Sequence, residues 1–216
     1  MVEIIPSILT DSASELAEMI DRVQGLVSRV HIDIMDGQFV DNETIDPAVV
    51  GEVGTSLLLD FHLSVKEPAS WIKKCVNAGA DRIIGHIEEM SSQNDFVSKV
   101  IEEGVQVGLA VDIETQLARL DEREIGNLDV ILLMSYPTGF GGQPFDKRVL
   151  EKIKVMDSLR KKEALRFRIC ADGGIDEKTI GMVAKAGADE VAIGRRFFEG
   201  EVEVNVKRYK SRAEKN

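Results

Sequence analysis

The sequence alternates short apolar runs with longer stretches of helical periodicity, and this alternation repeats along the chain. The apolar runs, rich in Val, Ile and Leu, span 3–9, 29–35, 57–65, 81–87, 106–111, 130–135, 166–172 and 190–194. Continuous runs of this length are typical of strands that are covered on both faces, as in a parallel sheet. Helical periodicity occurs at 13–26, 69–80, 93–104, 146–163 and 176–188. Eight strands joined by helices predict an α/β fold, a closed (β/α)8 TIM barrel.

Turn and capping residues agree with this alternation. The expected N-terminal caps are Asp11 or Ser12, Ser70, Asp146 and Asp176, because a short side-chain oxygen accepts hydrogen bonds from the free amides of a first helical turn. AGAD occurs at 78–81 and 186–189, and its Gly79 and Gly187 suit the left-handed residue that ends a helix. An open doubly wound sheet normally has a glycine-rich nucleotide loop after its first strand, whereas this chain has SILTDS.

Composition limits the class of protein. A chain of 216 residues that is 44% hydrophobic and 30% charged suits a single domain, residues 1–216, with a continuous core. Its net charge of −11 argues against a nucleic-acid-binding surface. We recognise no signal peptide, and no apolar run approaches the roughly 20 residues of a membrane span. Cys75 and Cys170 lie in apolar segments, which favours reduced thiols and a cytoplasmic location.

Polar side chains interrupt several of the apolar runs near their ends. His31 and Asp33 lie in the second run, His62 in the third, Asp172 in the seventh and Ser7 in the first. The carboxyl ends of barrel strands meet at one mouth, and an unpaired charge in an apolar run would be costly. Each histidine alone suits a hydrogen-bonded core residue. Together the two histidines and two carboxylates predict a site for Zn²⁺, Fe²⁺, Mn²⁺ or Co²⁺.

The segment HIDIMDG, residues 31–37, predicts which way these side chains point. Ile32 and Ile34 alternate with His31, Asp33 and Met35. Successive side chains of a strand point to opposite faces. We therefore expect the isoleucines to pack outward beneath the helices, and the other three to face the mouth of the barrel.

Two methionines and a third histidine also lie near strand ends. Met35 and Met134 suit either core packing or the lining of a site. His86, in GHIEE, has no carboxylate partner that the pattern places beside it. We expect it to be structural or to lie outside the ligand set.

Glycines follow three consecutive strands. GFGGQ, residues 139–143, follows the sixth run, Gly173 and Gly174 follow the seventh, and Gly194 follows the eighth. Barrel phosphate sites are commonly built from the loops after strands seven and eight. Because glycine lets backbone amides approach an anion closely, these loops predict a phosphorylated ligand.

These motifs together resemble those of the ribulose-phosphate 3-epimerases, a (β/α)8-barrel family. The resemblance runs through PSIL (6–9), HIDIMDGQFVDN (31–42), FHLSV (61–65), GFGGQ (139–143), CADGGI (170–175) and AIG (192–194). It implies an isomerase of carbohydrate metabolism with one divalent metal ion per subunit, usually zinc. The metal ligands that it implies are His31, Asp33, His62 and Asp172.

The resemblance also implies a reaction, the 3-epimerisation of a ketose phosphate, with D-ribulose 5-phosphate and D-xylulose 5-phosphate as the expected pair. Asp33 and Asp172 would exchange the proton on opposite faces of an enediolate that the metal stabilises. The implied contacts are Ser7 near the substrate and, at the phosphate, Gly141, Gly142, Gly173, Gly174 and Gly194. The other expected substrate contacts are His62, Met35, Met134, Gly139 and Arg195.

The chain departs from the family pattern around the expected substrate. Ser64 replaces the usual methionine after the HL pair, and Asp41 replaces a usual proline. SYPT at 135–138 lacks the proline that the family more often has directly before GFGG. Arg195 stands where the family typically has a phosphate-contacting serine, and suits either a charge-assisted contact or a solvated surface charge. These changes keep the metal and acid/base residues and leave the substrate open.

Three other functions fit parts of the pattern. An allulose-6-phosphate 3-epimerase would share the whole metal site. Hexulose-phosphate synthases typically use a lysine in a DxKxxD motif, where this chain has DFHLSVKE. A non-catalytic phosphosugar-binding paralogue would not need both histidines and both carboxylates. We therefore expect a sugar phosphate as the partner and, from the resemblance, a homodimer or homohexamer.

Overall fold

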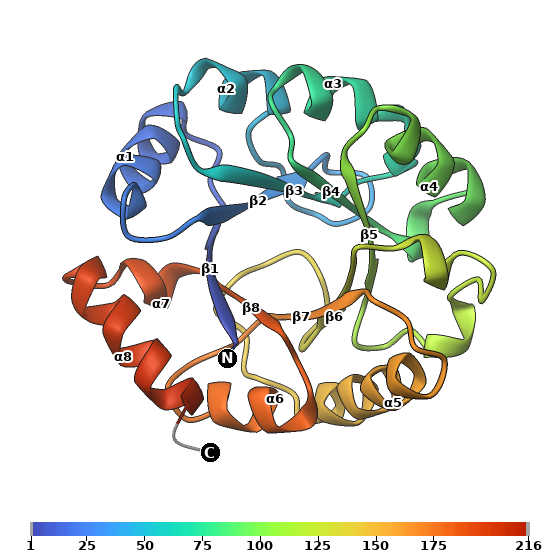
Figure 1. The fold of residues 1–216 in the computed structure, drawn as a ribbon. Coiled ribbons are helices and arrows are strands. Elements are labelled where there is room, and N and C mark those ends of the chain that lie inside the picture. The colour runs from blue at the N-terminus through green and yellow to red at the C-terminus, as the bar shows by residue number, and fades with distance from the viewer. Residues whose placement is uncertain (1, 215–216) are drawn as a thin grey trace.

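The computed structural model describes residues 2–214, and these form a closed parallel barrel inside a ring of helices (Figure 1). Met1 and residues 215–216 of the expected domain lie outside the described part. The strands are β1 (Glu3–Ile8), β2 (Arg29–Met35), β3 (Leu58–Ser64), β4 (Arg82–His86), β5 (Gln106–Val111), β6 (Val130–Met134), β7 (Arg168–Asp172) and β8 (Glu190–Ile193). They pair in chain order, and β8 closes on β1. The predicted (β/α)8 barrel is confirmed.

The outer ring contains three helices that the periodicity did not predict, namely α2 (Pro47–Glu52), α7 (Arg195–Phe198) and α8 (Val202–Glu214). The α-helices are α1 (Ala13–Val23), α2 (Pro47–Glu52), α3 (Ile72–Asn77), α4 (Gln93–Glu102), α5 (Arg148–Lys162), α6 (Ile180–Ala186), α7 (Arg195–Phe198) and α8 (Val202–Glu214). The 3-10 turns are Pro68–Ser70, Ile87–Glu89, Leu117–Arg119 and Ile125–Asn127. Within residues 2–214, no helix has the length and apolar character needed to cross a membrane.

Helix starts follow the predicted caps only in part. Ser12 caps α1, and its Oγ accepts the Glu15 N–H at 3.3 Å. The predicted cap Ser70 is wrong, because Trp71 precedes α3 and the Ser70 hydroxyl donates to the Glu67 carbonyl instead. A 3-10 turn at Pro68–Ser70 therefore takes the first part of the helix predicted at 69–80.

Asp146 and Asp176 accept backbone N–H groups, yet neither is the N-cap residue. Asp146 receives the N–H of Arg148 at 2.8 Å, and Asp176 receives that of Thr179 at 2.9 Å. The residues at the N-cap positions are Lys147 and Thr179. Both aspartates thus order the turn before the helix, and α5 and α6 begin later than the sequence predicts.

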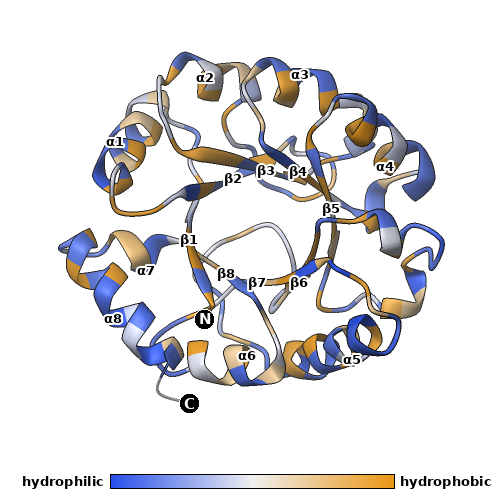
Figure 2. Ribbon diagram, viewed as in Figure 1, coloured by the Kyte–Doolittle hydropathy of each residue, from blue (hydrophilic) through white to orange (hydrophobic). Residues whose placement is uncertain are grey.

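The alternation within strands divides the apolar side chains into two layers. Ile32 and Ile34 are fully buried in the outer layer against the helices, as HIDIMDG predicts. A smaller cluster fills the barrel interior, namely Ile84, Ala110, Val130, Leu132, Met134, Cys170 and Ala192. The strands are largely hydrophobic, and hydrophilic residues gather on the outer helices (Figure 2). The core therefore has two separate layers, one inside the barrel and one between the sheet and the helices.

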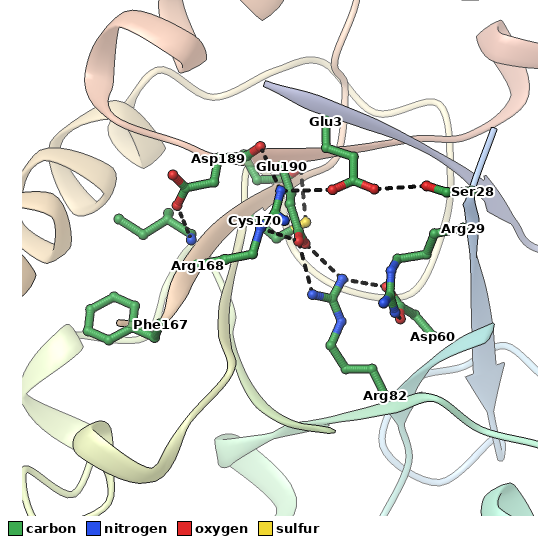
Figure 3. Close-up of polar contacts among 12 residues, drawn as sticks. Glu3, Ser28, Arg29, Asp60, Arg82, Phe167, Arg168, Cys170, Asp189 and Glu190 are labelled. Carbon is green, nitrogen blue, oxygen red and sulfur yellow. Dashed lines mark hydrogen bonds and ion pairs between the residues drawn. The ribbon is translucent and has the colours of Figure 1, made fainter. Parts of the chain in front are cut away.

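Buried ion pairs close the amino-terminal end of the barrel (Figure 3). Arg82 of β4 donates to Asp60 of β3, and also to Glu190 of β8 at 2.7 and 3.1 Å. Arg29 also pairs with Asp60, and Arg168 pairs with Glu190 at 2.7 Å. The network joins strands across the barrel interior. A functional site is therefore expected at the opposite, carboxyl-terminal end of the barrel.

Candidate active site and metal centre

The carboxyl ends of the strands surround a cavity of about 450 Å³. Strand residues and the loops that follow the strands line it, as expected for a barrel mouth. The predicted substrate-binding residues in its lining are Ser7, Met35, His62, Met134, Gly139, Gly141, Gly142, Gly173, Gly174, Gly194 and Arg195. The structure thus gathers at one mouth the residues that the sequence distributes over six strands and their loops.

Four of the predicted residues converge at this mouth: His31, Asp33, His62 and Asp172. One ligand atom of each lies within 4.8 Å of the others. His62 Nδ1 is 2.8 Å from Asp33 Oδ1 and 3.8 Å from Asp172 Oδ2. His31 Nε2 is 3.4 and 3.7 Å from the same two oxygens. Strand register contributes to this arrangement, because Asp33 and His62 are direct partners in the β2–β3 ladder.

These donor atoms fit a divalent cation. Both ring nitrogens of His31 are buried and have no hydrogen-bond partner among the described residues. A cation between the Nε2 nitrogen and the two carboxylate oxygens that it faces would pair with all three atoms. Two imidazoles with two carboxylates suit Zn²⁺ or a similar transition metal. The cluster can therefore hold one divalent metal ion.

The two carboxyl groups of the cluster differ in ionisation. Burial raises the pKa of Asp172, and the negative charge of Asp33 raises it further, to about 7. Burial also acts to raise the pKa of Asp33, but the adjacent His31 and His62 outweigh it and hold that pKa well below its usual range. Burial lowers the pKa of His62 to about 4, so this ring is neutral near pH 7, the form that binds metal.

The structure corrects one expectation about His86. Its Nδ1 lies 2.9 Å from Oε2 of Glu88, so a carboxylate partner is present. Glu88 belongs to the 3-10 turn Ile87–Glu89 directly after β4. The sequence pattern did not show that this turn folds Glu88 back onto His86. The other ring nitrogen, Nε2, lies 3.0 Å from His62 Nε2, so His86 contacts the ligand set from outside, as expected.

Glycine permits close packing of the loops after β6 and β7. Gly173 and Gly174 have φ of +103° and +59°, in the left-handed region that favours glycine. A Cβ on Gly174 would lie 2.8 Å from the backbone nitrogen of Phe145. These contacts hold the 139–145 segment against the start of the β7–α6 loop. They explain why glycine occupies positions 173 and 174 of this rim.

Two departures from the family pattern have distinct environments. The Ser64 hydroxyl is fully buried, lines the cavity and has no hydrogen-bond partner within residues 2–214. The Arg195 side chain is 89% exposed and lies 3.7 Å from Glu199. Tyr136 also lines the cavity, although sequence reasoning did not select it. It lies two residues after the end of β6, and only its position after a strand end could have pointed to it.

The fold and the site together define a (β/α)8-barrel enzyme with a candidate divalent-metal centre. The chain belongs to the ribulose-phosphate 3 epimerase family, whose family model matches residues 3–198. The ribulose-phosphate 3-epimerase of Bacillus subtilis is 37% identical over 92% of this chain and 93% of that protein. The enzyme of the same name from Escherichia coli is 34% identical over 91% of this chain and 88% of its own length. The chain is therefore an isomerase of the carbohydrate epimerase type.

Solved structures of lower sequence identity confirm the fold alone. A 3-hexulose-6-phosphate synthase from Salmonella typhimurium superimposes with a TM-score of 0.67 at 16% identity, over 98% of each chain. A mutant tryptophan synthase α-subunit from Pyrococcus furiosus gives 0.67 at 14% identity, over 96% of each chain. Both are similar in architecture.

Proposed function

We propose that this protein interconverts D-ribulose 5-phosphate and D-xylulose 5-phosphate by inversion at C3. The observation that carries the proposal is the pair of carboxylates, Asp33 of β2 and Asp172 of β7, that reach one buried centre. Strands β1 and β8 separate β2 from β7 in the barrel, so the two groups approach the centre from different sides. The relatives' names support a pentulose phosphate as the substrate.

The chemistry requires both acid/base groups and charge stabilisation. A proton next to a ketone is too weakly acidic for an unaided carboxylate to remove near neutral pH. When bound, a divalent cation, with zinc favoured over iron, manganese or cobalt, supplies a Lewis acid that stabilises negative charge on the enediolate. His31, Asp33, His62 and Asp172 would hold this ion.

Asp33 and Asp172 move the proton of C3. One carboxylate removes it from one face of the sugar carbon, and the other returns a proton to the opposite face. The Ser7 hydroxyl donates to Asp33 Oδ2 at 2.7 Å and holds this carboxylate beside His62, whose Nδ1 lies 2.8 Å from Oδ1. This fixes the carboxylate orientation before the substrate arrives, which lowers the cost of reaching a reactive geometry.

The glycine loops would bind the phosphate at the rim of the cavity. The residues proposed for this are Gly141, Gly142, Gly173, Gly174 and Gly194, through backbone N–H groups, with the exposed Arg195 guanidinium at the edge. Met35 and Met134 are 5% and 4% exposed and would pack against the carbon chain. The reacting carbons would then lie over the carboxylates, with the phosphate toward β7 and β8.

A substrate panel with metal removal tests this proposal. Coupled epimerase assays would compare ribulose 5-phosphate with allulose 6-phosphate for the protein as purified, after chelation and after addition of Zn²⁺, Fe²⁺, Mn²⁺ or Co²⁺. We expect a preference for ribulose 5-phosphate, loss of activity on chelation and recovery on addition of metal. A preference for allulose 6-phosphate would reassign the substrate. Full activity after complete metal removal would overturn the role of the cation.

A further inference from the structure

We infer that Glu88 is a positioning residue that acts through His86 to fix the tautomer in which His62 binds the cation. The inference rests on the proposed metal centre. Four side chains form a continuous series of contacts: Asp33 Oδ1 to His62 Nδ1 at 2.8 Å, His62 Nε2 to His86 Nε2 at 3.0 Å, and His86 Nδ1 to Glu88 Oε2 at 2.9 Å. The His62 and His86 side chains are at most 1% exposed.

With the cation bound to His62 Nδ1, these contacts fix the position of each proton. His62 Nδ1 faces the carboxylates of the centre, so as a ligand it must present a lone pair there. The single proton of the neutral ring then lies on Nε2 and is donated to His86 Nε2. His86 must accept with that nitrogen, which places its own proton on Nδ1. A carboxylate accepts and cannot donate, so Glu88 selects this arrangement at the far end of the series.

Glu88 uses both of its oxygens, and this explains why an amide could not replace it. Oε2 faces His86, and Oε1 accepts the Asp112 N–H at 3.0 Å. A glutamine has one acceptor oxygen. If its NH₂ group faced His86, both histidine tautomers would reverse and His62 would turn an N–H toward the metal centre. If its NH₂ group faced Asp112, two donors would oppose each other in a largely buried site.

The surroundings of His86 support the same proton arrangement. Phe39 packs against the imidazole with ring centres 5.2 Å apart, which limits rotation of the ring. The Thr138 hydroxyl lies 3.4 Å from His86 Nε2, but it donates to Asp112 Oδ2 at 2.8 Å. His62 is therefore the donor with the shorter contact to His86 Nε2. The Nε2–H of His62 is therefore the hydrogen-bond donor to the lone pair of His86 Nε2.

Glu88→Gln tests the inference, with Glu89→Gln as the matched control. Both substitutions remove one negative charge from the same 3-10 turn. Within the described residues, the Glu89 side chain makes no hydrogen bond or ion pair, whereas Glu88 makes both contacts given above. Zinc affinity would be measured on the full-length protein by competition with a chelator. We expect Glu88→Gln to bind zinc about 10- to 100-fold more weakly, and Glu89→Gln to bind it as the wild type does.

Imidazole ¹⁵N NMR of the zinc-loaded wild type reads the tautomers directly and does not depend on how a variant folds. The chain has three histidines, so each ring can be assigned. We expect the proton on Nε2 of His62 and on Nδ1 of His86. A His86 proton on Nε2, or equal zinc affinity in the two glutamine variants, would overturn the role of Glu88. Failure of the wild type to bind zinc would instead overturn the metal centre itself, and the inference with it.

Discussion

Removal of Arg82 tests how the closed end of the barrel is held together. Arg82→Met keeps an unbranched side chain but deletes the guanidinium that donates to Asp60 and Glu190 (Figure 3). The side chains of these two acids are 0% and 2% exposed. Water therefore cannot replace the lost hydrogen bonds, and each carboxylate keeps a single arginine, Arg29 or Arg168.

The expected cost follows from this geometry. Removing one partner of a buried ion pair costs about 3–5 kcal/mol, because the remaining charge is left uncompensated. Two carboxylates lose Arg82 at once, but each retains one other arginine. We therefore expect Arg82→Met to lower the free energy of unfolding by about 4 kcal/mol at pH 8, within that range.

The cost should depend on pH. Burial already raises the pKa of Asp60, although Arg82 and Arg29 oppose it, and loss of Arg82 raises it further. A carboxyl group whose pKa is raised by folding stabilises the folded state when it is protonated. Its contribution to the free energy of unfolding is therefore present below its ordinary pKa and is lost as the pH rises. Arg82→Met should therefore lower the free energy of unfolding by less at pH 5 than at pH 8.

Urea unfolding followed by circular dichroism at the two pH values measures both effects. Arg166→Met is the control, because Arg166 is exposed and makes no ion pair with the described residues, and it should change stability by less than about 0.5 kcal/mol. Asp60→Asn added to Arg82→Met should recover part of the loss. A loss below about 1 kcal/mol, or one that is equal at pH 5 and pH 8, would refute this account of the network.

Three further predictions concern the mouth of the barrel. Folding raises the pKa of Asp172 to about 7, so the free energy of unfolding of the metal-free protein should fall as the pH rises from about 4 to 7. Urea unfolding in the presence of a chelator should show a smaller fall in Asp172→Asn, and an equal fall in the two proteins would contradict the prediction. Zinc at 100 times its dissociation constant should stabilise the wild type by about 2.7 kcal/mol, and no shift of the thermal midpoint would argue against a native-state site. Gly174→Ala should raise KM for ribulose 5-phosphate more than it lowers kcat, because the added Cβ would displace the backbone at Phe145. The control Gly54→Ala, where a Cβ meets open space, should leave KM and kcat unchanged, and similar KM values for the two variants would contradict a role for the loop after β7.

The sequence predicts the direction of HIDIMDG because the alternation of a strand depends only on local geometry. Ile32 and Ile34 had to face the helices once a parallel barrel was inferred, and Asp33 and His31 then had to face inward. The rule that barrel strand ends share one mouth brought Asp172 to the same place. Periodicity and topology together were therefore enough to predict the four-residue cluster.

Contacts that depend on turn geometry or barrel closure were not predictable in the same way. Glu88 reaches His86 because a 3-10 turn follows β4, where the apolar pattern continued the strand to residue 87. Arg82 and Glu190 pair across the closed barrel, and no local pattern joins positions so far apart in the chain. The shifted start of α3 has a similar cause, since the Ser70 hydroxyl binds the Glu67 carbonyl instead of the helix amides.

Exchange of the C3 proton with solvent tests the central claim most directly. Zinc-saturated wild type, Asp33→Asn and Asp172→Asn would be incubated with ribulose 5-phosphate in D₂O, with Asp21→Asn, an exposed position on α1, as the control. We predict that the wild type and the control form xylulose 5-phosphate with deuterium at C3. We predict that each asparagine variant in the site epimerises at least about 100-fold more slowly at equal zinc occupancy. Wild-type rates in both Asp33→Asn and Asp172→Asn would contradict the two-carboxylate mechanism.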